Sequence, residues 1–170
     1  MSKTRSDEMP RGAVLLAAPD WRLAHWQDSL YPDGMPPEWR LAYFNTRFPG
    51  VWLSHAAWSG ITPAMAEEWL SDTRAEFRFV LEAGAVITPQ ERRLLDILAP
   101  RLGLHGGLDH PDVLWFAPGA DLRVLARSLR ERAARGRMIY LLSRDADLAT
   151  LGQVDTLLGL LDIGSADRVG

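Results

Sequence analysis

Residues 77–98 read FRFVLEAGAVITPQERRLLDIL, and this stretch decides the fold. The apolar run over residues 77–81 is typical of a buried strand. Thr88, Pro89 and Glu91 then supply an N-cap, a first-turn proline and the second half of a capping box, so a helix is predicted to begin at Pro89. A strand followed by a capped helix is one unit of an α/β fold.

The same unit recurs along the chain. Further apolar runs predict strands at residues 13–17, 51–53, 113–116 and 138–142. Helical spacing predicts helices over residues 37–47, 63–73, 89–98, 121–135 and 148–161. Because continuous apolar runs are typical of strands buried on both faces, and parallel strands need crossovers, we predict an α/β fold of about five βα units with a mainly parallel sheet. The glycine-rich residues 102–112 are predicted to be a loop.

Composition limits the classes of function. The chain has 170 residues, 47% of them hydrophobic, which fits a single α/β domain over residues 12–170 after a polar tail, residues 1–11, that we expect to be disordered. The net charge of -3 argues against a nucleic-acid partner, and no apolar run is long enough for a membrane partner. The chain has no cysteine, which excludes disulfides and thiolate metal sites, and we expect a cytoplasmic protein.

Several landmarks follow one another between residues 21 and 88. Trp21 and Trp26 bracket the first predicted turn, LYPDG occupies residues 30–34, and EWRLAYF occupies residues 38–44. In this order the landmarks resemble the first part of the YecE-like family, domain of unknown function 72. The resemblance implies an eight-stranded TIM-type barrel. Since about five strands are too few to close such a barrel, we expect an incomplete or reduced TIM-barrel-like architecture.

The chain departs from this family where the family carries polar groups at the ends of its strands. The residues at these positions are Trp52, Ser54, Ala57, Glu82 and Pro89. A Trp, Ala or Pro side chain cannot titrate as the family's polar residues do. The departures imply that the family's activity is lost, and we predict no catalytic residue, no cofactor, no metal and no organised acid–base pair at these strand ends.

A ligand site is a second interpretation of the same region. His25 and His55 each follow a predicted strand end, which places both on the edge where α/β proteins bind ligands. The side chains that would surround such a site are Trp21, His25, Trp26, Ser54, His55 and Trp58. The tryptophans either line a pocket for a small molecule or fill the space left by the missing strands.

Two other groups of residues have simpler explanations. A metal site could be built from the loop residues His105, Asp109, His110 and Asp112, but their spacing matches no established ligand pattern. Arginines recur with helical spacing at residues 123, 127 and 130, as expected for the solvent face of an amphipathic helix.

These observations lead to two hypotheses of function. The first is a noncatalytic protein that serves as a protein-interaction or assembly module. It is expected to be a homodimer formed through an edge strand or the apolar helix over residues 148–161, because a reduced sheet has free edges. The alternative is a small-molecule binding protein or residual enzyme that uses the aromatic and histidine rim.

Overall fold

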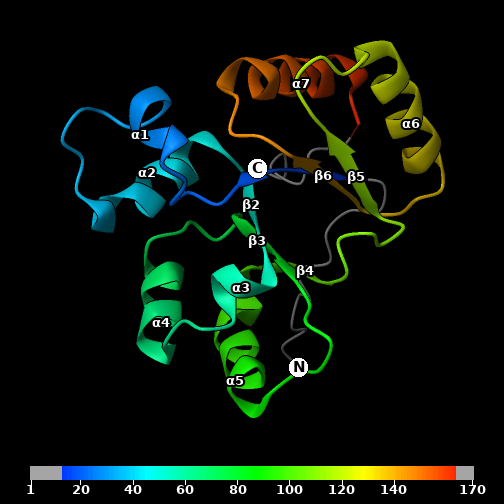
Figure 1. Ribbon diagram of the computed structural model, residues 1–170. Coiled ribbons are helices and arrows are strands. Elements are labelled where there is room, and N and C mark those ends of the chain that lie inside the picture. Colours follow the sequence, from blue (N-terminus) through cyan, green and yellow to red (C-terminus); the bar gives the residue numbers. More distant parts are fainter. Residues whose placement is uncertain (1–12, 164–170) are drawn as a thin grey trace, which may run out of the picture.

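The structure is a computed structural model that describes residues 13–163, so the predicted tail at residues 1–11 lies outside the described residues. Six strands form one parallel sheet in the order β4-β3-β2-β1-β6-β5. They are β1 (Val14–Pro19), β2 (Gly50–Leu53), β3 (Arg78–Glu82), β4 (Leu102–Gly106), β5 (Val113–Phe116) and β6 (Ile139–Ser143). The sheet curls and the helices lie around its outer face (Figure 1). The predicted α/β fold with an incomplete TIM-barrel-like architecture is therefore confirmed.

The five predicted helices begin within one residue of their predicted starts. The helices are α1 (His25–Ser29), η1 (Pro37–Trp39), α2 (Arg40–Arg47), α3 (His55–Trp58), α4 (Pro63–Ser71), α5 (Pro89–Leu98), η2 (Ala99–Arg101), α6 (Leu122–Ala134) and α7 (Leu148–Leu161). Side chains of Thr62, Thr88, Asp121 and Asp147 accept hydrogen bonds from the first turns of α4, α5, α6 and α7. The short helices α1 and α3 were not predicted. Within residues 13–163 no helix has the length and apolar character needed to cross a membrane.

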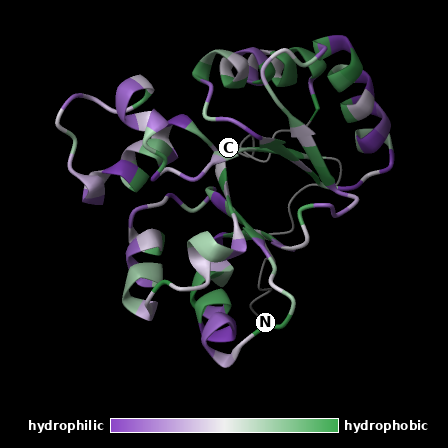
Figure 2. Ribbon diagram, viewed as in Figure 1, coloured by the Kyte–Doolittle hydropathy of each residue, from purple (hydrophilic) through white to green (hydrophobic). Residues whose placement is uncertain are grey.

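The central strand β1 explains the continuous apolar runs. All six of its residues are buried. Leu16 and Ala18 face the helices and belong to the larger core cluster, whereas Leu15 and Ala17 face the inside of the curl and belong to a smaller cluster. Figure 2 shows the same distribution, with hydrophobic strands at the centre and hydrophilic residues on helices and loops. A strand covered on both faces carries no polar alternation.

The glycine-rich stretch that was predicted to be a loop forms a strand in its first half. Strand β4 pairs in parallel with β3, with Val80 opposite Leu104 and Glu82 opposite Gly106. Gly103 lies close to its neighbour, because a Cβ atom there would lie 3.2 Å from the Cβ atom of Arg78. The prediction of a loop was wrong because glycine in a strand can mark close approach as well as a turn. The sheet therefore has six strands instead of about five.

The inside of the curled sheet is filled by side chains that reach across it. Trp52 on β2 donates a hydrogen bond from Nε1 to the carbonyl oxygen of Ser143 on β6 (2.7 Å) and meets the ring of Trp115 on β5 edge-on, 5.1 Å between centroids. Tyr140 on β6 donates its hydroxyl to the carbonyl oxygen of Gly103 on β4 (2.6 Å). Burial raises the pKa of this Tyr140 hydroxyl. Two tryptophans and one tyrosine thus join strands that are not neighbours in the sheet.

Candidate functional site

An open hollow of about 620 Å³ lies at the carboxyl ends of β1, β5 and β6. Its lining consists of Leu23, Ala24, His25, Pro118, Arg144, Asp145, Ala146 and Asp147. These residues come from the three loops that follow the strands, and the carboxyl edge of a parallel sheet is where α/β proteins bind ligands. The predicted position of His25 on this edge is therefore observed.

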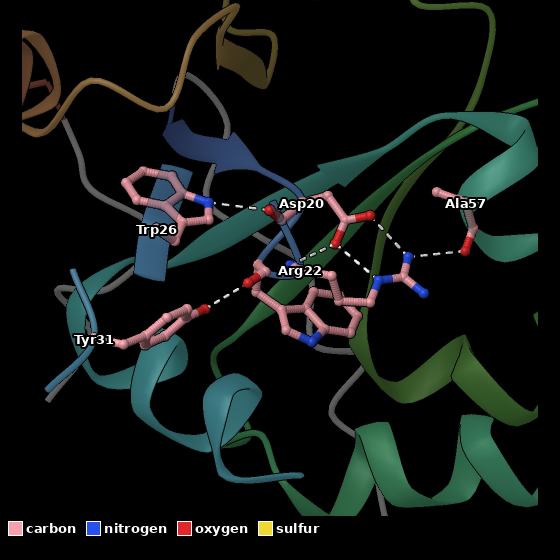
Figure 3. Close-up of polar contacts among 6 residues, drawn as sticks. Asp20, Arg22, Trp26, Tyr31 and Ala57 are labelled. Atoms are coloured by element: carbon pink, nitrogen blue, oxygen red, sulfur yellow. Dashed lines mark hydrogen bonds and ion pairs between the residues drawn. The ribbon is translucent and has the colours of Figure 1, made fainter. Parts of the chain in front are cut away.

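The loop that carries His25 is held in place by several hydrogen bonds (Figure 3). The carboxylate of Asp20 accepts hydrogen bonds from the backbone and the guanidinium of Arg22, and Arg22 also donates to the carbonyl oxygen of Ala57 (2.9 Å). The indole of Trp26 donates to the carbonyl oxygen of Asp20, and the Tyr31 hydroxyl donates to that of Trp21 (2.6 Å). One wall of the hollow is thereby fixed without a ligand.

The second predicted histidine, His55, lies at the end of β2 and is absent from the lining of the hollow. Its ring nitrogen Nε2 is 2.5 Å from the carboxylate oxygen Oε1 of Glu91 on α5. Its backbone N–H donates to the carboxylate of Glu82 at the end of β3 (3.0 Å). A Cβ atom at Gly84 would lie 2.6 Å from Nε2, so the loop after β3 packs directly on the imidazole.

This arrangement contradicts the prediction that no organised acid–base pair lies at these strand ends. Glu91 is buried, and its other oxygen accepts a hydrogen bond from the backbone N–H of Thr88 (2.9 Å). The Thr88 hydrogen bond, with the His55 ring as a second contribution, lowers the pKa of the Glu91 carboxyl. The prediction failed because it considered only residues at the ends of strands, whereas Glu91 reaches the edge from the first turn of a helix.

The three predicted tryptophans do not line a pocket. Trp21, Trp26 and Trp58 are 4%, 0% and 0% exposed. Trp21 meets the ring of Trp69 edge-on at 4.8 Å, and Trp58 donates its indole N–H to the carbonyl oxygen of Glu82 (2.8 Å). Of the two interpretations of the tryptophans, the structure favours the filling of space.

The comparisons with known proteins agree with this geometry. A family profile described as Protein of unknown function DUF72 matches residues 15–143. The chain belongs to the DUF72 family. A solved structure of a DUF72 family protein from Enterococcus faecalis V583 is similar in fold, with a TM-score of 0.53 and 9% sequence identity over 89% of this chain and 98% of that chain. The comparison with curated proteins finds no match.

In this DUF72 protein the residues of the rejected metal hypothesis do not form a cluster. His105 lies on β4, where its ring meets Trp58 edge-on at 5.5 Å, and burial lowers the pKa of its imidazole. Asp112 lies beside His110, with 3.8 Å between Oδ2 and Nδ1, and forms an ion pair with Arg137 (2.8 Å). Within the part of the chain that the structure describes, no group of three or more His, Cys, Asp or Glu side chains is arranged to hold a metal ion.

The carboxyl edge of this DUF72 protein thus has two separate parts. The His55–Glu91 pair joins α3 to α5 and has its ring against Gly84 and Trp58, whose centroid lies 5.8 Å from that of His55. The hollow carries His25 with three charged residues, Arg144, Asp145 and Asp147, that the sequence analysis did not single out as site residues. Their position directly after a predicted strand was the signal that could have identified them.

Proposed function

We propose that this chain is a noncatalytic DUF72 protein that serves as a protein-interaction or assembly module, with a second copy of itself as its first partner. The observation that carries the proposal is the filled interior, where Trp52, Trp115 and Tyr140 occupy the space that a barrel of this type would enclose. Two of these three side chains are tryptophans, which cannot titrate. Burial raises the pKa of Tyr140 above its ordinary value of 10.0, so it stays protonated at neutral pH.

The His55–Glu91 pair is compatible with a noncatalytic protein. Both oxygens of Glu91 already accept hydrogen bonds from the chain, one from His55 and one from Thr88. The imidazole is fixed between two elements, and this contact stabilises the fold. A pair that only orients a histidine defines no reaction without a nucleophile or a bound substrate beside it.

The sheet has two edges that differ in how well they are protected. On β5, the Arg132 guanidinium donates to the carbonyl oxygens of Pro111 (2.6 Å) and Val113 (3.3 Å), which covers part of that edge. On β4, the Tyr140 hydroxyl donates to one carbonyl oxygen, that of Gly103 (2.6 Å), and all five residues are half-buried. The Gly106 carbonyl oxygen accepts a hydrogen bond from the backbone N–H of Ala83, directly after β3, so the backbone of Gly106 faces β3. Because successive residues of a strand direct their backbone groups to opposite sides, the N–H and C=O groups of His105 point away from β3. Strand β4 is therefore the edge we assign to the partner.

A second copy fits this edge. Two β4 strands related by a two-fold axis would pair antiparallel and turn two six-stranded sheets into one continuous sheet. Helix α7 is the other surface predicted for a dimer, but its residues Leu151 and Val154 are buried against the chain's own core. Leu160 is the only large apolar side chain of α7 that is exposed.

Light scattering at micromolar concentration tests the proposal. We expect twice the chain mass of 19.0 kDa, and slower hydrogen exchange at the His105 amide in the dimer than after dilution. The variants Leu160→Glu on α7 and Val124→Glu on α6 are matched controls, because both side chains are exposed. Neither should dissociate the dimer. A mass of 19.0 kDa throughout would overturn the homodimer, and dissociation by Leu160→Glu alone would move the interface to α7.

Ligand binding at the carboxyl edge, the alternative function, is favoured by a different observation, the hollow between the three loops. It is independent of the assembly proposal.

A further inference from the structure

Three charged side chains line the hollow at the ends of β1, β5 and β6, and they differ in the contacts that they make with the chain. Arg144 directly follows β6, and its backbone N–H donates to the carbonyl oxygen of Phe116 (2.9 Å). Its guanidinium carbon lies 4.7 Å from the ring centroid of Trp115. Within residues 13–163 this guanidinium makes no hydrogen bond and no ion pair with the protein, so its N–H donors are available to a ligand.

The acidic residues of the hollow differ in how they are used. Asp147 caps α7, and its two carboxylate oxygens accept from the backbone of Ala149 (3.2 Å) and the hydroxyl of Thr150 (2.7 Å). Asp145 is exposed, and in the described part of the chain its carboxylate has no hydrogen-bond or ion-pair partner. One cation and two anions therefore line the hollow. The carboxylate of Asp147 is already hydrogen-bonded by the chain, whereas Arg144 and Asp145 form no ion pair with each other within residues 13–163.

The remaining lining is mostly apolar. Leu23 is 41% exposed, which is high for a large aliphatic side chain, and Pro118 and Ala146 lie in the same lining. The Leu23 backbone belongs to the loop that the Asp20–Arg22 hydrogen bonds fix in place (Figure 3). An apolar side chain of a ligand would thus find a surface that needs no rearrangement, which reduces the entropic cost of binding.

From these groups we propose that the hollow binds a small zwitterion of the amino-acid class. The ligand carboxylate accepts hydrogen bonds from the guanidinium of Arg144, which offers two parallel N–H donors in a fixed plane. The ligand ammonium takes the carboxylate of Asp145, and the ligand side chain lies against Leu23. A ligand with a single charge would leave either Arg144 or Asp145 without a counter-charge, so such a ligand should bind more weakly than a zwitterion.

Three probes with the same isobutyl group test this assignment. L-leucine carries both charges, 4-methylpentanoate carries only the carboxylate, and 3-methylbutylamine carries only the ammonium. The readout is the indole N–H signal of Trp115 in a nitrogen-15 correlation spectrum, identified by its loss in Trp115→Phe. We expect saturable shifts with L-leucine at a dissociation constant on the order of 1 mM. Each single-charge probe should bind at least about tenfold more weakly, because hydrogen bonds to charged groups are the strong ones.

Variants locate the site. Arg144→Gln and Asp145→Asn should each weaken L-leucine binding by about tenfold or more. The matched controls Arg127→Gln and Asp33→Asn, at exposed positions outside the hollow, should leave it unchanged. The same spectra report whether each variant remains folded. Equal shifts from all three probes, binding that Arg144→Gln leaves unaltered, or the absence of any saturable shift of Trp115 would each overturn the proposal.

Discussion

The carboxylate of Glu91 joins two elements through its two oxygen atoms. One oxygen accepts from Thr88 and closes the capping box of α5, and the other meets the ring of His55 on α3. Both contacts favour the ionised form, so the pKa of Glu91 lies below its ordinary value of 4.5. A carboxyl with a lowered pKa in the folded state contributes stability above its unfolded pKa, and this contribution is lost as the pH falls through the folded pKa.

We therefore predict that Glu91→Gln is less stable than the wild type at neutral pH and that the difference shrinks below about pH 4.5, where the unfolded carboxyl begins to be protonated. Urea titrations between neutral pH and about pH 3 measure the difference. The substitution Glu76→Gln, at an exposed position, is the control and should show no such convergence. Parallel curves for Glu91→Gln and the wild type would show that the two contacts do not stabilise the fold through the charge of Glu91.

For single residues, the sequence predicted where a residue lies in the fold better than what its side chain contacts. The position of His25 after the first strand was sufficient to place it on the carboxyl edge. The burial of Trp21 and Trp26 could not be read from the sequence, since an aromatic ring near a strand end can face either the core or a pocket. The pairing of His55 with Glu91 depends on how α3 and α5 pack, which the spacing of 36 residues does not encode.

Strand β4 is the element whose prediction failed, and its two glycines, Gly103 and Gly106, have different surroundings. A Cβ atom at Gly103 would lie 3.2 Å from the Cβ atom of Arg78 and 3.4 Å from a ring carbon of Tyr140, whereas the nearest atom to a Cβ at Gly106 is 4.0 Å away. The sequence signal of glycine was the same at both positions. Only the pairing with β3 and the contact with Tyr140 distinguish them.

We predict that Gly103→Ala lowers the free energy of unfolding by about 1 to 3 kcal/mol, as expected when a methyl group is forced into packed surroundings. Gly106→Ala is the matched control in the same strand. It should lie within about 0.5 kcal/mol of the wild type or be slightly more stable, because alanine restricts the unfolded chain. Equal effects of the two substitutions in urea titrations would argue against the register of β4.

The successes and failures of the predicted elements have a physical reason. A capped helix start depends on neighbouring residues alone, as at Thr62 and Thr88, so the signal is complete in the sequence. An edge strand depends on a partner far along the chain, and the short helices α1 and α3 have too few residues to show a period. Local interactions therefore account for the successful predictions, and distant packing accounts for the failures.

On the scale of the whole molecule, the interior contacts replace the strands that would complete a barrel. The chain passes from β4 at one edge to β5 at the other through residues 107–112 alone, without a helix. Leu108 in this connection packs on the inner cluster and accepts a hydrogen bond from the indole of Trp115 (3.0 Å). Trp52 then links β2 to both β5 and β6. The two halves of the sheet are thus joined across the inside as well as along β1.

Trp52 should accordingly contribute to stability in two separable ways. Trp52→Phe keeps an aromatic ring but leaves the Ser143 carbonyl oxygen without its donor, which should cost about 1 kcal/mol. Trp52→Ala also removes the ring and should cost about 3 kcal/mol, at the low end for large aromatic truncations because Trp52 is only half-buried. Trp39→Ala, whose side chain is 63% exposed, is the control and should change stability by less than about 0.5 kcal/mol.

A double-mutant cycle of Trp52→Ala with Trp115→Ala should give a coupling of about 0.5 to 1.5 kcal/mol, the range of edge-to-face aromatic pairs. Additive losses, or a cost for Trp52→Ala no larger than for Trp39→Ala, would mean that the interior contacts do not hold the two halves of the sheet together.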